Sequence, residues 1–277
     1  MMSLKLMYIT NRPEIAQIAE SAGVDRIFVD MEYIGKADRQ GGMDTVQSHH
    51  TVDDVAKIKK SIISAKLVVR CNPIHTATEN FCSSEEEINA VIANGADIIM
   101  LPFFKTAEEV ERFIKIVNGR ARTMLLFETP SAVEKIDDIL SVGGIDEVFI
   151  GLNDLSLGYG KKFMFELLTD GTVDALCYKF KQKNLPYGFG GIASLGHGAL
   201  PSEMVIKEHY RLGSTCAILS RSFCNVNQIE HMGIISSTFV NGIREIREFE
   251  KQCEAYSDYF LNNQRDVEKA VKHIIES

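Results

Sequence analysis

The chain has 277 residues, of which 45% are hydrophobic, and a formal net charge of −8, so it can fill the core of one large domain. No segment gathers Lys and Arg into a basic stripe, no apolar run approaches the roughly 18 residues of a membrane span, and Met1–Lys5 lacks a signal region. We therefore expect a soluble cytoplasmic protein that binds neither nucleic acid nor a membrane.

The six cysteines are scattered along the chain and form no CxxC pair. This spacing matches neither a zinc ribbon nor a dense disulfide framework. We predict that most of them are reduced and pack as small hydrophobic side chains. A catalytic cysteine would need a paired base, and the sequence indicates none.

Short apolar runs alternate with segments of helical periodicity along most of the chain. The predicted strands are Lys5–Ile9, Arg26–Asp30, Leu67–Arg70, Asp97–Leu101, Thr123–Glu128, Glu147–Gly151, Tyr187–Gly190 and Thr215–Leu219. The predicted helices between them are Pro13–Ala22, Val52–Ser64, Glu85–Asn94, Ala107–Val117, Ser131–Val142, Thr172–Lys183 and Glu203–Leu212. This alternation favours an α/β fold, a closed (β/α)8 TIM barrel rather than an open sheet.

Capping signals support several of these helix boundaries. Thr106–Glu109 has the pattern of a capping box, with Thr as N-cap and Glu three residues later, and Ser84–Glu87 repeats it. Gly23, Gly95 and Gly213 each follow a predicted helix, which they are expected to end.

Beyond the eighth strand, Asn241–Tyr256 and Asn263–Ile275 have the pattern of two charged helices, more than one barrel helix requires. We therefore predict a catalytic barrel domain over residues 1–225. Residues 226–277 would form the last barrel helix and a tail. This tail is expected either to pack across the bottom of the barrel or to dock on a neighbouring subunit.

Two neighbouring predicted strands lead into carboxylates, Glu128 and Asp154. In a parallel α/β fold both acids lie at the same end of the sheet, where barrels keep their active sites. Two carboxylates without a neighbouring Cys or His are hard oxygen ligands that suit Mg²⁺ or Mn²⁺. Acids at strand ends also cap helices, so the pair alone supports either interpretation.

The residues around this pair are more specific. Phe127–Thr129 and Ala132–Ser156 together closely resemble the signature of the HpcH/HpaI aldolase and citrate lyase β-subunit family, and the resemblance extends over roughly residues 15–224. It implies a barrel enzyme of the pyruvate- or phosphoenolpyruvate-binding type that makes or breaks a carbon–carbon bond next to an enolate. It also implies that Glu128 and Asp154 bind the metal.

An arginine is predicted to be catalytic. Arg70 closes the strand Leu67–Arg70 and matches the family's arginine at the end of a VVR strand. A guanidinium there can hold a carboxylate and a keto oxygen and stabilise an enolate. The alternative is an arginine paired with a structural acid. Asp30–Glu32 resembles the family's D-x-E motif, in which the acid, here Glu32, supports the arginine and a metal-bound water.

The chain departs from the family after this motif. Family aldolases usually continue with histidine, whereas this chain has Tyr33 and a longer loop, Ile34–His50. The histidine of the family aldolases also stands a few residues before an Asp-Val helix start. The resemblance therefore implies that His50, or alternatively His49, replaces that histidine as acid or base. In a further alternative a metal-bound water moves the proton and both histidines are solvated loop residues.

The segment of Gly151, Leu152, Asn153 and Asp154 follows a strand and is predicted to bind a substrate carboxylate with its backbone N–H groups. The family normally has proline where this chain has Leu152, so we expect a less rigid loop. A glutamine that is common in the family is replaced by Leu126. We expect position 126 to form an apolar wall at the mouth of the barrel.

A glycine-rich stretch, Gly188–Gly198, follows the seventh predicted strand, and Arg221 follows the eighth. These two loops often bind phosphate in barrels, and glycine lets a backbone approach an anion closely. We therefore predict that Gly190, Gly191 and Arg221 bind an acidic or phosphorylated substrate. The alternative is a merely flexible loop.

Together with these residues, the resemblance implies a divalent-metal-dependent carbon–carbon lyase of the class II pyruvate aldolase type, cleaving or forming a 2-keto-3-deoxy or 4-hydroxy-2-oxo acid through a pyruvate enolate. No Schiff-base lysine motif is found in the strands. One alternative is a citryl- or malyl-CoA-type lyase, for which we find no basic adenine-binding segment. The other is a non-catalytic ligand-binding barrel, suggested by Tyr33 and Leu126. The resemblance also implies a homo-oligomer, because family members commonly exchange their last helix.

Overall fold

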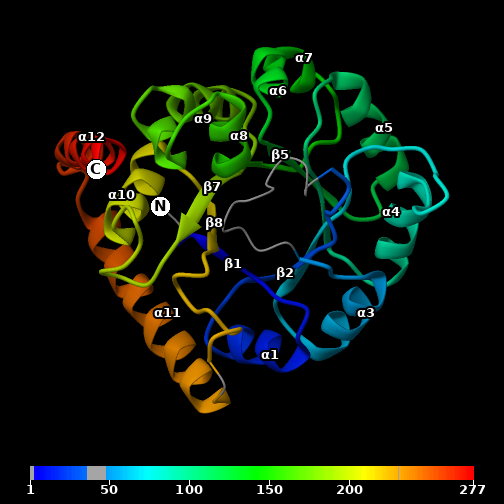
Figure 1. Cartoon of the computed structure of the whole chain (residues 1–277), viewed down its shortest axis with the longest axis horizontal. Coiled ribbons are helices and arrows are strands. Elements are labelled where there is room, and N and C mark those ends of the chain that lie inside the picture. Colours follow the sequence, from blue (N-terminus) through cyan, green and yellow to red (C-terminus); the bar gives the residue numbers. More distant parts are fainter. Residues whose placement is uncertain (1–2, 36–47, 230) are drawn as a thin grey trace.

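The structure, a computed structural model, describes residues 3–35, 48–229 and 231–277. Within these residues, parallel strands follow one another around a closed barrel in chain order, and the last pairs with the first (Figure 1). The strands are β1 (Lys5–Ile9), β2 (Arg26–Asp30), β3 (Lys66–Arg70), β4 (Ile98–Leu101), β5 (Arg122–Phe127), β6 (Glu147–Ile150), β7 (Tyr187–Ile192) and β8 (Cys216–Leu219). The predicted TIM barrel is confirmed.

Helices surround the barrel (Figure 1). They are α1 (Pro13–Ser21), α3 (Val52–Ser61), α4 (Ser84–Ala93), α5 (Ala107–Val117), α6 (Pro130–Glu134), α7 (Ile136–Ile139), α8 (Leu152–Gly158), the 3-10 helix η1 (Met164–Leu168), α9 (Thr172–Gln182), α10 (Ser202–Leu212), α11 (Met232–Ala255) and α12 (Phe260–Glu276). The single helix predicted over Ser131–Val142 is instead divided into α6 and α7. Lys135 lies between them with φ −102° and ψ 20°, which interrupts the helix.

The N-cap of α4 is Ser83, one residue earlier than predicted. Its Oγ accepts the Glu86 N–H, and the Glu86 carboxylate accepts the Ser83 N–H in return. The predicted Ser84 cap was wrong because Glu87, its expected partner, is buried and accepts hydrogen bonds from Asn72 instead. The other predicted capping box, at the start of α5, is confirmed.

Apolar side chains fill the interior of the barrel, and a buried ion pair lies at the end where the strands begin, which we call the lower end. Arg26, at the start of β2, donates hydrogen bonds of 2.7 and 2.8 Å to Glu147, at the start of β6. Both residues are buried, and Arg122 adds a 2.9 Å contact to Glu147. Strands β2 and β6 stand on opposite sides of the barrel, so this ion pair links them across its interior. At their other ends, the two strands lead to the predicted site residues Glu32 and Asp154.

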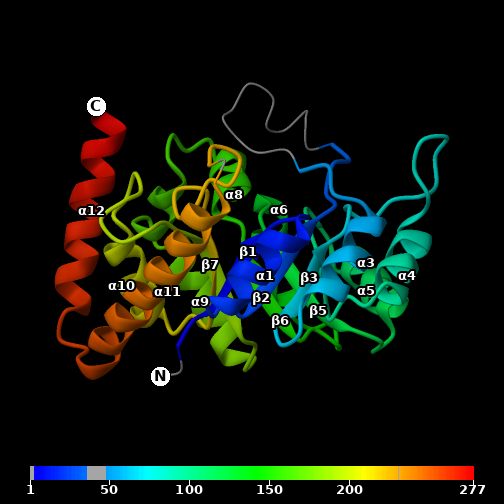
Figure 2. The same cartoon turned by 90° about the horizontal axis from the view of Figure 1, so that it is seen from below.

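The chain after β8 packs on the outside of the barrel. Glu250 of α11 accepts hydrogen bonds from the Leu4 N–H (2.7 Å) and the Tyr210 hydroxyl (3.1 Å). Asn263 of α12 donates to Glu208 of α10 at 2.8 Å. Helix α12 lies along the side of the barrel, beside α10, so packing across the bottom was a wrong expectation (Figures 1 and 2). The domain boundary and the exchange of a helix between subunits stay predictions.

All six cysteines are free thiols, and all but Cys82 are buried, as predicted. Burial raises the pKa of the Cys71, Cys177 and Cys216 thiols above the usual range. This disfavours the nucleophilic thiolate form. None of the helices in the described ranges combines the length and apolar character that crossing a membrane requires.

Replacing Glu147 by Leu is expected to lower the free energy of unfolding by about 3–5 kcal/mol, because Arg26 is left buried without its partner. The double variant Arg26→Met, Glu147→Leu should recover most of this loss, because no unpaired charge stays in the interior. Urea denaturation of the two variants and the wild type measures both effects. Equal losses in the single and double variants would contradict this assignment.

Candidate active site

A cavity of about 580 Å³ lies at the carboxyl ends of the strands. The predicted site residues that line it are His50, Arg70, Glu128, Gly151, Leu152, Asn153, Asp154, Gly190, Gly191 and Arg221. Glu32 is fully buried, and it contacts Arg70 rather than lining the cavity. The barrel therefore brings the predicted residues to one place, which we call the catalytic cavity.

Glu128 directly follows β5 and is held by the neighbouring loop. Its Oε1 accepts the backbone N–H of Phe103 at 2.9 Å. Phe103 has φ 49°, a left-handed conformation that is unfavourable for a bulky residue. A Cβ on Gly151 would lie 2.8 Å from both Cβ and Oε2 of Glu128. The carboxylate can therefore occupy this position because residue 151 is glycine.

Acidic groups crowd around Glu128, which is 3% exposed, and Asp154, which is 8% exposed. Burial raises the pKa of Glu128 well above its usual value. Glu32 and Asp154 raise it further, whereas Arg70 lowers it. A cation bound beside these acids would favour their charged forms.

Arg70 is held by two carboxylates, Asp30, which lines the cavity, and Glu32, which does not. Its Nε and Nη2 donate hydrogen bonds of 2.8 Å to the two oxygens of Asp30, and its Nη1 lies 3.2 Å from Glu32. Burial alone would lower the pKa of Arg70, but Asp30 and Glu32 raise it well above the usual value. Arg70 is therefore both paired with acids and present in the cavity wall as a fixed positive charge.

The two loop histidines have different surroundings. His50 lines the catalytic cavity, and its Nδ1 accepts the Asp30 N–H at 3.0 Å, so the neutral ring carries its proton on Nε2. His49 is exposed and, like Tyr33, lines a neighbouring cavity of about 390 Å³. We call this neighbour the side pocket; its lining residues include Met31, Tyr33, His49, His50, Asn72, Phe81 and Glu87. Tyr33 therefore replaces the family's histidine in sequence but not in the catalytic cavity.

The apolar wall predicted at position 126 is confirmed. Leu126 and Leu152 both line the catalytic cavity. Phe104 is buried in the core, where its ring packs edge-on against Phe127 with centroids 5.1 Å apart. Phe103 contributes to the site through its backbone N–H, which donates to Glu128. A hydrophobic side chain in the sequence does not indicate such a role.

Another part of the cavity wall comes from the loops after β7 and β8. Gly190 has φ 54°, and a Cβ on Gly191 would lie 3.2 Å from the Cβ of Ser220. Arg221 is exposed and lines the cavity. These residues share one surface, and their binding of a phosphate stays a prediction.

Sequence reasoning missed the lining residues that follow β1. Thr10, Asn11 and Arg12 all line the catalytic cavity. A polar triplet directly after a predicted strand was the available signal, since the same rule led to Asp154. Asn225, after β8, also lines the cavity and carries no sequence motif.

The predicted loop Ile34–His50 falls largely outside the described residues, which omit positions 36–47. At its start, the Ile34 N–H donates to the Asn72 side chain at 3.0 Å. At its end, Ser48 lines the catalytic cavity beside His50.

Comparison with known proteins agrees with this geometry. The family model for HpcH/HpaI aldolase/citrate lyase matches residues 5–164, more than half of the chain. The chain belongs to the HpcH/HpaI aldolase/citrate lyase family. The match includes Arg70, Glu128 and Asp154, whereas Gly190, Gly191 and Arg221 lie beyond it. A comparison with curated proteins finds no match.

Several solved structures share the fold. An HpcH/HpaI aldolase/citrate lyase family protein from Burkholderia cenocepacia J2315 is 15% identical, with a TM-score of 0.62 over 88% of this chain and 94% of its own. An HpcH/HpaI aldolase from Desulfitobacterium hafniense DCB-2 is 16% identical, with a TM-score of 0.58 over 89% of this chain and 93% of its own. The citrate synthase SbnG is 16% identical, with a TM-score of 0.57 over 79% of this chain and 85% of its own. At 15–16% identity, these similarities show a shared fold and nothing further.

In this member of the HpcH/HpaI family, Glu128 and Asp154 fit a divalent cation. Both offer hard oxygen ligands, and their crowding with Glu32 is the kind of repulsion that a cation relieves. Within the described ranges, no three His, Cys, Asp or Glu side chains form a larger ligand group. Magnesium is often held by one or two carboxylates, with waters and substrate oxygens completing its shell.

Replacing Gly151 by Ala is expected to displace the Glu128 carboxylate and to cost about 1–3 kcal/mol of stability through overpacking. The displacement should shift the amide resonance of Phe103 in a ¹⁵N-phenylalanine spectrum, because that N–H donates to Glu128. Gly143→Ala is the matched control, since a Cβ there meets nothing within 4 Å. An unchanged Phe103 resonance in Gly151→Ala would contradict the predicted displacement.

Proposed function

We propose that the protein is a divalent-metal-dependent carbon–carbon lyase of the class II pyruvate aldolase type. Its substrate would be a 2-keto-3-deoxy or 4-hydroxy-2-oxo acid, cleaved or formed through the enolate of pyruvate. The proposal rests on the meeting of Glu128, Asp154 and Arg70 at one cavity, within the region that matches a lyase family.

Glu128 and Asp154 would hold Mg²⁺ or Mn²⁺. Such an ion, when bound, supplies Lewis acidity toward a keto oxygen. The Phe103 N–H fixes one oxygen of Glu128 and so sets the orientation of the carboxylate. The backbone that leads from Gly151 to Asp154 lines the same cavity, where its N–H groups can orient a substrate carboxylate.

Arg70 is suited to the anionic part of the substrate. Its guanidinium has more N–H groups than its contacts with Asp30 and Glu32 use, and it lines the cavity. These groups can donate to a carboxylate or enolate oxygen. Because the two acids hold the guanidinium in place, it would stabilise developing negative charge without first reorganising.

His50 is suited to donate a hydrogen bond from its Nε2. With Nδ1 occupied by the Asp30 N–H, the neutral ring carries a proton on Nε2. We therefore assign His50 the role of hydrogen-bond donor to the aldehyde oxygen, where it would stabilise the negative charge that develops as the carbon–carbon bond forms. Water in the cavity would supply the proton that this oxygen takes up and, in the cleavage direction, would accept the proton of the substrate hydroxyl.

The far end of the substrate would carry an acidic or phosphate group. Arg12 and Arg221 come from the loops after β1 and β8, which are neighbouring strands, and both line the cavity. Gly190 and Gly191 lie in the same wall and let the backbone approach an anion closely.

A non-catalytic barrel is the second candidate. Leu126 supports it, because an apolar side chain lines the cavity where the family commonly has glutamine. Tyr33 gives it less support, since this residue lines the side pocket while His50 faces the catalytic cavity. The lyase is therefore the better supported function.

Pyruvate release from a panel of 2-keto-3-deoxy acids, with and without a terminal phosphate, tests the lyase. We expect cleavage to be lost after treatment with EDTA and dialysis and restored by Mn²⁺ or Mg²⁺. Arg70→Lys should lower kcat/KM by about 100-fold or more, because the two-pronged contact is lost. Glu85→Gln, an exposed acid on α4, should have no effect. Full activity after chelation and dialysis would contradict the metal mechanism.

A further inference from the structure

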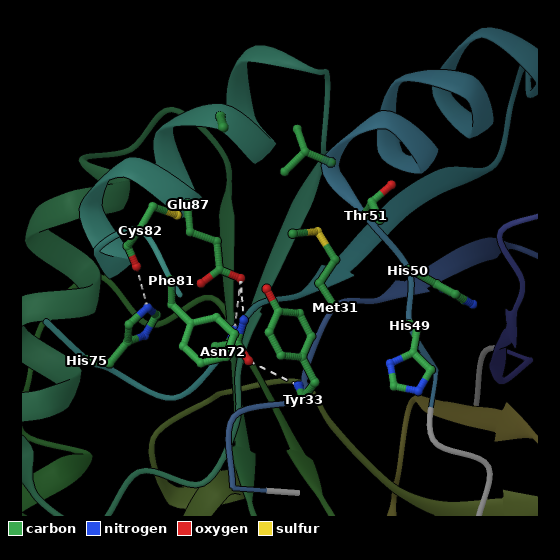
Figure 3. A pocket seen from close by; sticks show the side chains of 12 residues that line it. Met31, Tyr33, His49, His50, Thr51, Asn72, His75, Phe81, Cys82 and Glu87 are labelled. Carbon is green, nitrogen blue, oxygen red and sulfur yellow. Dashed lines mark hydrogen bonds between the residues drawn. The ribbon is translucent and has the colours of Figure 1, made fainter. Parts of the chain in front are cut away.

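The side pocket is a second place where this protein can bind a small molecule. It lies between α3, α4 and the segments that follow β2 and β3 (Figure 3). Its volume of about 390 Å³ falls within the usual range for small-molecule sites. The proposed lyase chemistry assigns it no role.

A buried carboxylate lines this pocket with one oxygen unused. Glu87 is 4% exposed, and its Oε1 accepts hydrogen bonds from both the backbone N–H (3.1 Å) and the side-chain amide (3.0 Å) of Asn72. Its other oxygen, Oε2, receives no hydrogen bond from any residue that the structure describes (Figure 3). Burial raises the pKa of Glu87 more than the hydrogen bonds from Asn72 lower it, so a further donor to Oε2 would favour the charged form. Because Glu87 lines the pocket, this oxygen can accept a hydrogen bond from a ligand that enters it.

Two aromatic rings stand beside this carboxylate. Tyr33 and Phe81 both line the pocket, with ring centroids 5.4 Å apart and planes inclined by 43° (Figure 3). Aromatic faces attract cations, and the interaction strengthens where water is excluded. A carboxylate together with aromatic faces is suited to an organic ammonium group.

The walls of the pocket are fixed by hydrogen bonds within the protein. The Asn72 side-chain oxygen accepts the Tyr33 N–H at 3.0 Å. The His75 ring bonds to the Cys82 carbonyl at 2.7 Å and so holds the loop that carries Phe81. The backbone of Tyr33, the loop that carries Phe81 and one oxygen of Glu87 are thus held before a ligand arrives, which reduces the entropy lost on binding.

The charged side chains that line the pocket favour a cationic ligand over an anionic one. Of the described residues that line it, none is Lys or Arg. The N-terminus of α3 borders the pocket at Thr51, but its capping box with Asp54 places an acid there. The catalytic cavity is different, because Arg12, Arg70 and Arg221 line it.

We propose that the side pocket binds the ammonium group of a small organic amine, with Glu87 Oε2 accepting its N–H and Tyr33 and Phe81 packing against its carbon atoms. His50 lines both cavities, so the bound amine would lie next to a residue of the catalytic cavity. The site itself does not depend on the lyase activity.

Benzylamine is a suitable probe. Benzyl alcohol, a neutral compound of similar size, and benzoate, an anionic one, are the controls. Methionine methyl groups report on each cavity separately, because Met31 lines the side pocket whereas Met100 and Met164 line the catalytic cavity. In protein labelled with ¹³C at the methionine methyl groups, benzylamine should shift the Met31 resonance, which Met31→Leu identifies. Benzyl alcohol should bind about tenfold more weakly or worse, and benzoate should leave Met31 unchanged.

Three variants complete the test. Glu87→Gln should weaken benzylamine binding by about tenfold or more, because a charged acceptor is lost. Phe81→Ala should weaken it several-fold, and Glu85→Gln, an exposed acid on the same helix, should not change it. The proposal is overturned if benzylamine leaves Met31 unshifted, if benzoate shifts it equally, or if affinity is unchanged in Glu87→Gln. Should Glu87→Gln fail to fold, unchanged affinity in Phe81→Ala overturns it as well.

Discussion

The two ion pairs of Arg70 are the interaction on which the mouth of the barrel depends. Asp30, Glu32 and Glu128 come from the ends of β2 and β5, and all three are buried. The guanidinium pairs with Asp30 and Glu32, which removes much of the cost of burying them. Glu128 instead accepts one backbone N–H and lies among like charges. This difference leaves Glu128, with Asp154 beside it, as the place where a cation would be most favourable.

The position of Glu128 depends on backbone rather than on other charged side chains. Phe103 holds a strained conformation with its N–H directed at the carboxylate, and Gly151 leaves the space that the carboxylate occupies. Strain of this kind persists where the surrounding structure determines it, and here β4, β5 and β6 are neighbouring strands of a closed barrel. The ion pair of Arg26 and Glu147 stabilises the same barrel from its lower end.

The periodic part of the fold could be predicted from the sequence, because strands and helices alternate with clear apolar periods. Glu128, Asp154 and Arg70 could be placed at one site because each stands at or just after the end of a strand. Other features depend on tertiary contacts that no local pattern encodes. The N-cap of α4 is Ser83 rather than the predicted Ser84. Glu87, the expected partner of Ser84, instead accepts hydrogen bonds from Asn72, which is distant in sequence.

The same limit applies to the finer parts of the site. The proton position on His50 follows from a hydrogen bond to the backbone of Asp30, which the sequence cannot indicate. The role of Phe103 resides in its N–H, so its side chain carried no signal. The side pocket brings together Tyr33 after β2, Asn72 and Phe81 after β3 and Glu87 of α4, and no local pattern in the sequence indicates that these residues meet.

The most direct test of the central claim, that Glu128, Asp154 and Arg70 promote formation of a pyruvate enolate with a divalent metal, is exchange of pyruvate's methyl protons with deuterium from solvent. The account predicts exchange in the presence of enzyme and Mn²⁺, followed by ¹H NMR, and its loss after EDTA or in Glu128→Gln. Pyruvate that binds the Mn²⁺-loaded protein in calorimetry but shows no exchange above the rate without protein would contradict it.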